Sequence, residues 1–479
     1  MRILIVGNDP REIGGVANYT RPLAVRLSEL GNDVYYLHSG AYHDKYEFRR
    51  RPYLKIRNDL YPFECAEIVN PTNLPFNFGY PELDMRSTEM DAVIGQYLTR
   101  TKPDLMHIHS RFGLPASMSE IAHRKGISVV NTIHVYGYIC QKRVMIDREG
   151  EPCCGPDDVL KCAECTGILD YRRERFRARS RRFKERLKQK SPRFFNTLLK
   201  IKARMRMTGR SGQPLAVQAT SGRSSDDALK TLAERLAVRL KYCVDMLNDY
   251  SDRVICVSSD VKVTLSRYGV RDDKMLVQHI GSTIAERQTI EDRPLHKPLV
   301  VGNIGGVNHY KGTHILVEAA AKTKNKEFLV LIYGKYVKSY VDQMSAVADG
   351  IPLEFMGRYE PEGLAEILKH IDVMVLPSIC NDTAPQTIFE SFSGGVPIIA
   401  SNIGGFPDFV HHEKNGLLFE AGNSADLAEK IDYVLSHSDK IGEFRKNIPR
   451  LKTIDDNAKE LIALYRELLR DRRAIAAIK

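Results

Sequence analysis

The stretch "DVMVLPSICNDTAPQTIFESFSGGVPIIASN" (372–402) holds one strand–loop–helix–strand unit. The apolar run 372–378 predicts a buried strand, and Pro385 suits the first turn of a short helix over 386–393. A Gly-Gly pair then ends the helix, and the apolar residues 396–402 predict a second strand. A repeated unit of this kind is typical of a parallel sheet covered by helices.

The same alternation of short apolar runs and helical patterns continues in both directions from this unit. Two series of units, separated near 287–298, predict two α/β domains, 1–285 and 286–453, followed by a helix at 454–479 that crosses back to the first domain. We expect strands at 2–7, 33–40, 104–110, 128–134, 253–259, 299–305, 328–335, 353–359 and 415–421, and helices at 15–31, near 115–125, 226–249 and 312–323. An insert, 135–222, interrupts the alternation in the first domain.

The bulk composition is that of a soluble globular chain. Its 479 residues suffice for two or three domains, and 43% of them are hydrophobic. No apolar run approaches the roughly 18–20 residues that a membrane-spanning helix requires. The N-terminal "MRILIVGNDP" reads as a first buried strand and not as a signal peptide. We therefore expect a cytoplasmic chain with reduced thiols among its nine cysteines.

The positive charge of the chain is concentrated in the insert. Residues 172–210 contain 17 Lys and Arg against two acidic residues, a local net charge of +15. Since the whole chain has a net charge of +11, the remainder carries −4. An anionic partner would be met at this basic segment.

Two carboxylates, Asp382 and Glu390, lie on either side of the start of the 386–393 helix. Asp382 falls in the loop at the carboxyl end of a strand, which is where open α/β sheets bind ligands. A carboxylate on the loop and one on the helix could hold hydroxyls at two points of a single ligand. The alternative is that Asp382 caps the helix or faces solvent, and that Glu390 only faces solvent.

Glycine-rich junctions occur near the start of each domain. "GNIGGVNHYKG" (302–312) follows a strand and carries Lys311, which could neutralise a diphosphate, although a lysine on a surface turn is equally common. "IGGVANYT" (13–20) could bring backbone amides close to an anion at a helix start. Together they predict a phosphate-bearing ligand in the cleft between the domains. The chain contains no Asp-x-Asp triplet, so cationic residues and helix N-termini would replace a catalytic metal.

These motifs, in this order, resemble the retaining nucleotide-sugar glycosyltransferases of the GT-B fold, glycosyltransferase family four. The resemblance covers both α/β domains and is weakest over 41–100 and the insert. It implies two Rossmann-like parallel-sheet domains that face each other across a cleft, and a UDP- or GDP-sugar donor. The motifs that carry it are the Gly-Gly pair at 14–15, "NTIH" (131–134), "GNIGGVNHYKG", "DTAPQTIFES" (382–391), "GGVPIIASNIGG" (394–405) and "NGLLF" (415–419).

The resemblance also implies roles for individual residues. Glu390 would bind the ribose, Asp382 the hydroxyls of the transferred sugar, and Lys311 the diphosphate. His134 would contact the donor sugar near the bond that breaks, although a histidine that merely packs at a strand end would look the same. The implied catalytic set is His134, Asp382 and Lys311. The implied nucleotide-sugar set is Gly14, Gly15, Gly305, Gly306, Lys311, Arg358, Ile388 and Glu390.

The chain departs from the family pattern at two points. Asp382 stands where the family has a glutamate, so its reach is one methylene shorter and the donor sugar is left open. Gly305 and Gly306 stand where many members have a phosphate-binding arginine, and Lys335 or Arg358 could compensate. The family mechanism is transfer on the front face of the sugar with retention, in which the leaving phosphate helps to take the acceptor proton.

The insert begins with a cysteine cluster directly after His134. Cys140, one of Cys153 and Cys154, and the Cys162-x-x-Cys165 pair would supply four thiolates, with Cys153 as the first choice at the open position. Four thiolates suit a structural zinc ion and leave no position for catalysis. Free thiols or a disulfide are the alternatives.

The basic segment at 172–206 alternates cationic residues with phenylalanine and leucine. This pattern suits an anionic membrane surface, and it would suit nucleic acid or a solvated helical hairpin as well. The resemblance favours the membrane, because family members often act on lipid-linked acceptors. We therefore predict peripheral association with the inner face of the cytoplasmic membrane and expect no nucleic-acid partner.

The leading functional hypothesis is sugar transfer from a nucleotide-diphosphate donor to a lipid-linked or polysaccharide acceptor in cell-surface glycan synthesis. A second enzyme hypothesis is another activity on this fold, such as a sugar-nucleotide epimerase or a phosphorylase. A zinc-stapled nucleic-acid-binding protein is the hypothesis from a different class, but it leaves two complete α/β domains without a task.

Overall fold

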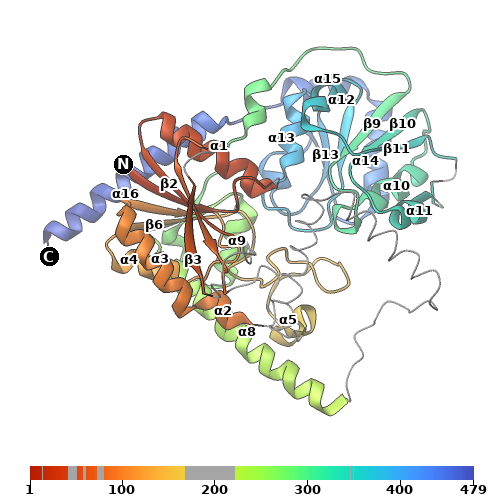
Figure 1. Ribbon diagram of the computed structural model, residues 1–479. Helices are drawn as coiled ribbons and strands as arrows, with labels where there is room; N and C mark the ends of the chain where they lie inside the picture. The colour runs from red at the N-terminus through yellow and green to blue at the C-terminus, as the bar shows by residue number, and fades with distance from the viewer. Residues whose placement is uncertain are drawn as a thin grey trace, which may run out of the picture.

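The computed structural model describes residues 1–12, 14–40, 51–57, 61–72, 80–167, 222–345, 347–348 and 350–478. Within these ranges the chain forms two α/β domains, each with a central sheet covered by helices (Figure 1). The basic segment 172–206 lies outside the described residues, so the expectations for it stay predictions.

The structure describes eight strands in the N-terminal sheet, in the order β3-β4-β2-β1-β5-β6-β7-β8. Neighbouring strands are parallel except at β3–β4, which pair antiparallel at the edge. The strands are β1 Arg2–Gly7, β2 Asp33–Ser39, β3 Tyr53–Arg57, β4 Glu64–Val69, β5 Leu105–Ile108, β6 Ser128–Ile133, β7 Arg253–Cys256 and β8 Met275–Val277.

Helices cover both faces of this sheet because alternate side chains of its buried strands point to opposite sides. On β1, Leu4 and Val6 pack with residues of α3 and α4, whereas Ile3 and Ile5 belong to the core cluster that includes α1 and α8. The helices of this domain are α1 Gly15–Glu29, α2 Pro81–Met85, α3 Thr88–Thr101, α4 Met118–Arg124, α5 Val159–Thr166, α8 Gly222–Tyr250 and α9 Ser259–Arg267.

The C-terminal sheet has the strand order β11-β10-β9-β12-β13-β14, and its neighbouring strands are parallel. Its strands are β9 Leu299–Ile304, β10 Phe328–Tyr333, β11 Leu353–Gly357, β12 Val373–Leu376, β13 Ile398–Ser401 and β14 Gly416–Phe419. Its helices are α10 Thr313–Lys322, α11 Lys338–Ser345, α12 Leu364–Lys369, α13 Gln386–Ser393, α14 Ser424–Ser436 and α15 Asp439–Lys446. Short 3-10 turns are η1 Asp272–Lys274, η2 Thr283–Arg287, η3 His309–Lys311, η4 Pro361–Gly363 and η5 Phe406–Asp408.

The last helix, α16 (Ile454–Ile478), leaves the C-terminal domain and lies against the N-terminal one beside α1 (Figure 1). Tyr19 of α1 donates a hydrogen bond of 2.6 Å from its hydroxyl to Asn457 Oδ1, and Arg26 pairs with Asp455. Further along α16, the Tyr465 hydroxyl lies 2.5 Å from His107 Nδ1. The two domains are therefore joined by this helix as well as by the linker.

The prediction of two parallel-sheet α/β domains is confirmed, and the strand at 372–378 and helix at 386–393 are observed as β12 and α13. One boundary was wrong: α8 begins at Gly222, whereas the helical pattern predicted a start at 226. Edge strands β3 and β4 fall in 41–100, where we predicted no elements. The side chains of β3 are half-buried or exposed, so they give no strong periodic signal.

In the described part of the chain, the helices all lack either the length or the apolar character needed to cross a membrane.

Candidate active site

The loop after β12 and the turn after β9 meet at the carboxyl edge of the C-terminal sheet. Lys311 lies in η3, and its Nζ is 2.6 Å from Asp382 Oδ2. Ser378 at the end of the β12 run donates a second hydrogen bond of 3.1 Å to the same carboxylate oxygen. Two motifs 71 residues apart thus come together as an ion pair at the edge where this fold binds ligands.

The turn that carries Lys311 is fixed by its neighbours in the sequence. Asn308 accepts a hydrogen bond of 3.0 Å from the Lys311 amide and so caps the turn. Gly312 has φ of 70°, and a Cβ at this position would lie 1.7 Å from the carbonyl oxygen of Pro377. Only glycine lets the turn approach the β12 loop this closely.

The electrostatics of the pair favour the charged forms. Burial alone lowers the pKa of Lys311, but the charge of Asp382 and the hydrogen bond to it outweigh burial, so the Lys311 pKa is raised. Lys311 therefore remains a cation at the carboxyl edge of the C-terminal sheet, which is what binding of a diphosphate would need.

Glu390 lies on α13, behind this loop. Its carboxylate is half-buried, and the Tyr359 hydroxyl is 3.4 Å from Glu390 Oε2. Burial raises the pKa of Glu390, and the hydrogen bond from Tyr359 offsets part of that increase. Tyr359 comes from the chain just after β11, so Glu390 and Asp382 lie on one sheet edge but have different partners.

The other residues expected to bind the nucleotide sugar differ from one another in exposure and in the contacts that they make. Gly305 (φ 118°) follows β9, and its carbonyl oxygen would lie 1.7 Å from a Cβ added at Gly334. Arg358 is exposed and pairs with Glu360 at 3.3 Å. The Ile388 side chain is fully buried in the hydrophobic core, and its contact with the nucleotide sugar stays a prediction.

At the edge of the N-terminal sheet, α1 begins at Gly15 with Gly14 as its cap. A Cβ added at Gly14 or Gly15 would meet no atom within 4 Å. A Cβ added at Gly306 would lie 3.0 Å from the Asn308 side chain. The first turn of α1 contains no acidic residue, so the positive end of the helix dipole is left without a carboxylate of its own turn.

His134 follows β6 and lies at the contact between the domains. The Thr383 hydroxyl donates a hydrogen bond of 2.7 Å to the His134 carbonyl oxygen, which brings the loop of Asp382 against the N-terminal domain. The His134 Nε2 is 3.1 Å from His109 Nδ1. This contact places His134 on the same side of the molecule as the Lys311–Asp382 pair.

Three histidines form a buried row behind this contact. His107, His109 and His134 are all nearly inaccessible, and the His107 and His109 ring centres are 3.8 Å apart. Burial lowers the pKa of His107 and of His134 to about 3 and lowers the pKa of His109 well below its usual value. The row is therefore neutral near pH 7 and acts through hydrogen bonds, not through charge.

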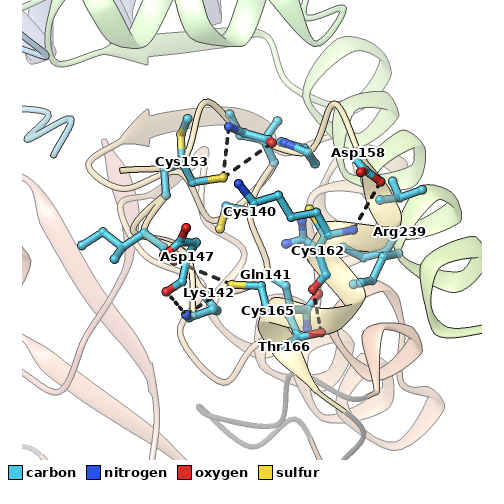
Figure 2. Close-up of a pocket in the computed structure, with 18 residues that line it drawn as sticks. Cys140, Gln141, Lys142, Asp147, Cys153, Asp158, Cys162, Cys165, Thr166 and Arg239 are labelled. Atoms are coloured by element: carbon cyan, nitrogen blue, oxygen red, sulfur yellow. Dashed lines mark hydrogen bonds between the residues drawn. The ribbon is translucent and has the colours of Figure 1, made fainter. Parts of the chain in front are cut away.

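Four of the cysteine side chains line one cavity of about 40 Å³ next to α8 (Figure 2). They are Cys140, Cys153, Cys162 and Cys165. The Gly155 amide donates to Cys153 Sγ at 3.4 Å, and Lys142 Nζ donates to Cys165 Sγ at 3.3 Å. Cys154, the open alternative to Cys153, is exposed and is not part of the lining.

The chemistry of this donor set fits zinc, but its arrangement is not that of a formed metal site. Among the described residues, His, Cys, Asp and Glu side chains are nowhere gathered in threes or more with metal-binding geometry. Burial raises the pKa of Cys162 to about 12, and the neighbouring thiols Cys140, Cys153 and Cys165 add to this. The thiols are thus close enough to influence each other.

Several site residues escaped the sequence analysis. His109 could have been suspected from the alternation of "MHIHS" (106–110), which puts two histidines on one face of a strand. Tyr359 and Thr383 gave no signal, because their partners Glu390 and His134 are distant in sequence.

Two family models match this chain. "Glycosyltransferase Family 4" matches residues 13–201, and "Glycosyl transferases group 1" matches residues 286–451. The two matches fall on the N-terminal and the C-terminal α/β domain, respectively.

Curated relatives are similar over parts of the chain. A D-inositol 3-phosphate glycosyltransferase of Corynebacterium urealyticum is 27% identical over 254 residues, which cover 48% of this chain and 59% of the relative. An amylovoran biosynthesis glycosyltransferase, AmsK, of Erwinia amylovora is 23% identical over 179 residues, covering 35% of this chain and 40% of the relative. The chain thus matches between two fifths and three fifths of the length of these two relatives.

Solved structures match almost the whole chain. A sucrose-phosphate synthase from Thermosynechococcus elongatus is 17% identical with a TM-score of 0.62, covering 98% of this chain and 99% of that one. Anabaena Alr3699/HepE, solved in complex with UDP and glucose, is 15% identical with a TM-score of 0.56, covering 97% and 99%. At these identities the likeness shows the fold. Each α/β domain thus matches a glycosyltransferase family model, and the two domains have the GT-B fold.

Proposed function

We propose that this protein is a retaining glycosyltransferase that moves a sugar from a nucleotide-diphosphate donor to a lipid-linked or polysaccharide acceptor. The observation that carries the proposal is the Lys311–Asp382 pair at the carboxyl edge of the C-terminal sheet, joined to His134 through Thr383. That arrangement supplies a cation, a carboxylate and a neutral imidazole around one point of the cleft.

On the donor side, each residue has a separate task. Lys311 would exchange its contact with Asp382 for the diphosphate, which leaves Asp382 free to accept hydrogen bonds from the sugar hydroxyls. Glu390 would accept hydrogen bonds from the ribose, and the start of α1 at Gly15 would offer its amides to the phosphates. The complex of Anabaena Alr3699/HepE with UDP-glucose supports a nucleotide sugar as the donor class.

The chemical step needs no metal in this arrangement. The bond between the anomeric carbon and the phosphate oxygen breaks, and negative charge develops on the leaving diphosphate beside Lys311. The acceptor hydroxyl forms its bond on the same face of the sugar, and its proton passes to the leaving phosphate oxygen. His134, being neutral, would act by hydrogen bonding to the sugar.

A test of the donor assignment is thermal unfolding with UDP, GDP and ADP, followed by hydrolysis assays of the nucleotide sugars whose nucleotide stabilises the protein. We expect one nucleotide to raise the melting temperature and expect Lys311→Ala, Asp382→Ala and Glu390→Ala each to lower hydrolysis at least tenfold. Glu366→Ala, on the exposed side of α12, is the matched control. Unaltered hydrolysis in all three site variants would overturn the assignment.

The acceptor and the location are supported by the sequence alone. The amylovoran relative acts in polysaccharide biosynthesis, and a 27% identical relative in Arabidopsis thaliana is a sulfoquinovosyl transferase. We propose a lipid-linked or glycan acceptor and peripheral contact with anionic lipid through 172–206. Deletion of 172–206 should abolish binding to anionic liposomes at low salt; undiminished binding would refute the contact.

We also propose a structural zinc ion at the four cysteines that line the cavity of Figure 2. Zinc would deprotonate the thiols and fasten the loop after His134 to α5, which carries Cys162 and Cys165. Metal analysis of the purified protein should find about one zinc ion per chain. Cys162→Ser should lose it and Cys154→Ser should keep it; a chain free of zinc, or equal zinc in both variants, would reject the site.

A further inference from the structure

A second, smaller cavity lies where β5 and β6 end, directly beside His134. Its volume is about 20 Å³, which is room for about one water-sized group. Val135 at its rim is 37% exposed, so the cavity lies next to solvent. The lining consists of Ile108, His109, Ser110, Arg111, Thr132, Ile133, His134, Val135, Gly137, Tyr138 and Arg143. Among these described residues there is no Asp or Glu.

Two buried nitrogen atoms in this lining have no hydrogen-bond partner among the described residues. They are His109 Nε2 and Arg111 Nε, and both side chains are at most 5% exposed. Buried polar atoms are nearly always paired in folded proteins, so an unpaired couple at one cavity indicates a missing partner. Since His109 Nδ1 is engaged with His134, its Nε2 can carry the proton and donate, as Arg111 Nε does.

Arg143 adds a second guanidinium to the lining of the same cavity. It is half-buried and lies 4.6 Å from the centre of the Phe112 ring, and within the described chain it forms no ion pair or side-chain hydrogen bond. Desolvation lowers the pKa of Arg143 to about 10, and the charge of Asp84 only partly offsets this. A half-buried guanidinium that no carboxylate hydrogen-bonds is costly unless a ligand completes it.

The neighbouring Arg111 and Arg239 show how an arginine is paired with a carboxylate in this part of the fold. Arg111 and Arg239 both pair with Asp84, at 2.9 and 2.7 Å, and Arg239 also donates to the Tyr138 carbonyl oxygen. The Asp84 carboxylate thus already forms ion pairs with two guanidinium groups, those of Arg111 and Arg239. With Arg143 the cluster has three guanidinium groups and one carboxylate, an excess of positive charge.

We propose that this cavity is an anion subsite, in which Arg143, Arg111 and His109 bind one oxygen of a phosphate or carboxylate group. The size of the cavity admits a single oxygen of such a group, and the rest of the group would lie toward solvent beside His134. Assigning that group to the acceptor rests on the proposed function; the anion subsite itself does not.

The test is thermal unfolding with inorganic phosphate at constant ionic strength. We expect saturating phosphate to raise the melting temperature of the wild type by about 2–5 °C. Arg143→Gln should abolish the rise, whereas Arg148→Gln, an exposed arginine of the same loop, should keep it. Lys311→Gln should also keep it, which separates this site from the diphosphate site.

Without phosphate, Arg143→Gln should melt at or above the wild-type temperature, because it removes a half-buried charge that no carboxylate hydrogen-bonds. A clear drop in that temperature would show a purely structural arginine and overturn the proposal. So would a phosphate response that survives in Arg143→Gln, or one lost only in Lys311→Gln.

Two further comparisons separate the sources of the anion and the two proposals. Glucose 6-phosphate that stabilises more than equimolar inorganic phosphate, in an Arg143-dependent way, supports an organic phosphate group; an equal effect supports a free anion in the same subsite. If nucleotides bind but Arg143→Gln keeps the phosphate response, the subsite fails and the proposed function stands. If no nucleotide binds but Arg143→Gln loses the phosphate response, the proposed function fails and the anion subsite stands.

Discussion

At the scale of single residues, Lys311 and Asp382 neutralise each other before any ligand arrives. Lys311 is 36% and Asp382 22% exposed, so the pair is neither a surface bridge nor fully desolvated. A diphosphate carries more negative charge than the Asp382 carboxylate does. The diphosphate of the donor can therefore take the place of Asp382 beside Lys311, which leaves the carboxylate free to bind the sugar. Aspartate is one methylene shorter than glutamate. The shorter side chain is compatible with that movement, because the approach of the two loops already brings Asp382 to 2.6 Å from Lys311.

The first prediction concerns Asp382→Asn. This variant leaves Lys311 without a carboxylate, and we expect the free energy of unfolding to fall by about 1–2 kcal/mol, less than for a fully buried pair because water reaches both groups. Nucleotide affinity should hold or rise several-fold, since Lys311 is released, while transfer falls. Urea denaturation and calorimetric titration measure the two effects.

Asp342→Asn is the matched control, since the Lys338–Asp342 pair on α11 is largely exposed and should contribute little to stability. A variant Asp382→Asn that bound nucleotide much more weakly than the wild type would show that Asp382 organises the nucleotide site itself.

The second prediction follows from the histidine row. In the folded state burial holds the pKa values of His107 and His134 near 3 and that of His109 well below normal, whereas in the unfolded chain each titrates near 6.5. As pH falls below about 6.5, the unfolded chain takes up protons that the folded chain excludes. Stability should therefore fall from pH 7 to 5, with a slope from these three groups approaching about 4 kcal/mol per pH unit.

Urea denaturation between pH 5 and 7 measures that slope. His109→Gln removes one of the three protons and should reduce the slope by about a third, whatever its effect on stability at pH 7. His437→Gln, on the exposed end of α14, should leave it unchanged. Equal slopes in the wild type and His109→Gln would mean that the row is already open to water.

At the scale of elements, the sequence was informative where burial is continuous. β9, β12 and β13 are buried along their whole length, and their apolar runs placed them within two or three residues at each end. The edge location of Asp382 and Lys311 follows from the same runs, because parallel strands end on one edge. The ion pair between them was not predictable, since nothing in spacing shows that Gly312 packs against Pro377.

Other parts of the site depend on contacts between distant elements. The partner of Glu390 is Tyr359, and the partner of His134 is His109; both contacts are set by strand order, which local patterns do not contain. The cysteine spacing did indicate which thiols gather, but only the fold distinguishes Cys153 from Cys154. Burial of Ile388 likewise depends on how α13 packs on the sheet.

The third prediction concerns the turn before α10. Gly312→Ala would place a Cβ 1.7 Å from the Pro377 carbonyl oxygen in a backbone region that alanine avoids. The turn must move, so we expect a loss of about 2 kcal/mol or more in stability and at least a tenfold loss of nucleotide affinity as Lys311 is displaced. Gly363→Ala at the start of α12 meets nothing within 4 Å and should change neither quantity measurably. Retained affinity in Gly312→Ala would remove Lys311 from the nucleotide site.

At the scale of the whole molecule, the two domains share more than a linker. The largest core cluster contains residues of both domains and of α16, and Asn457 on α16 holds Tyr19 of α1 and accepts from the Gly281 amide. The Tyr19 ring in turn lies 5.1 Å from the His134 ring, centre to centre. This connection therefore reaches the same contact between the domains as the Thr383–His134 hydrogen bond.

The last prediction tests whether that hydrogen bond holds the two halves of the site together. Thr383→Val keeps the shape of the side chain and removes the donor to the His134 carbonyl oxygen, which costs about 0.5–1.5 kcal/mol in the closed arrangement. Transfer and donor hydrolysis should fall by about two- to tenfold. Nucleotide affinity by calorimetry should fall less than the rate does, because Lys311 and Glu390 lie in the C-terminal domain and only the amides at the start of α1 would come from the other domain. Thr231→Val, an exposed position on α8, controls for the substitution itself. If nucleotide affinity fell as much as the transfer rate, the role of Thr383 would be to shape the donor half of the site. The hydrogen bond would then not be what holds the two halves together.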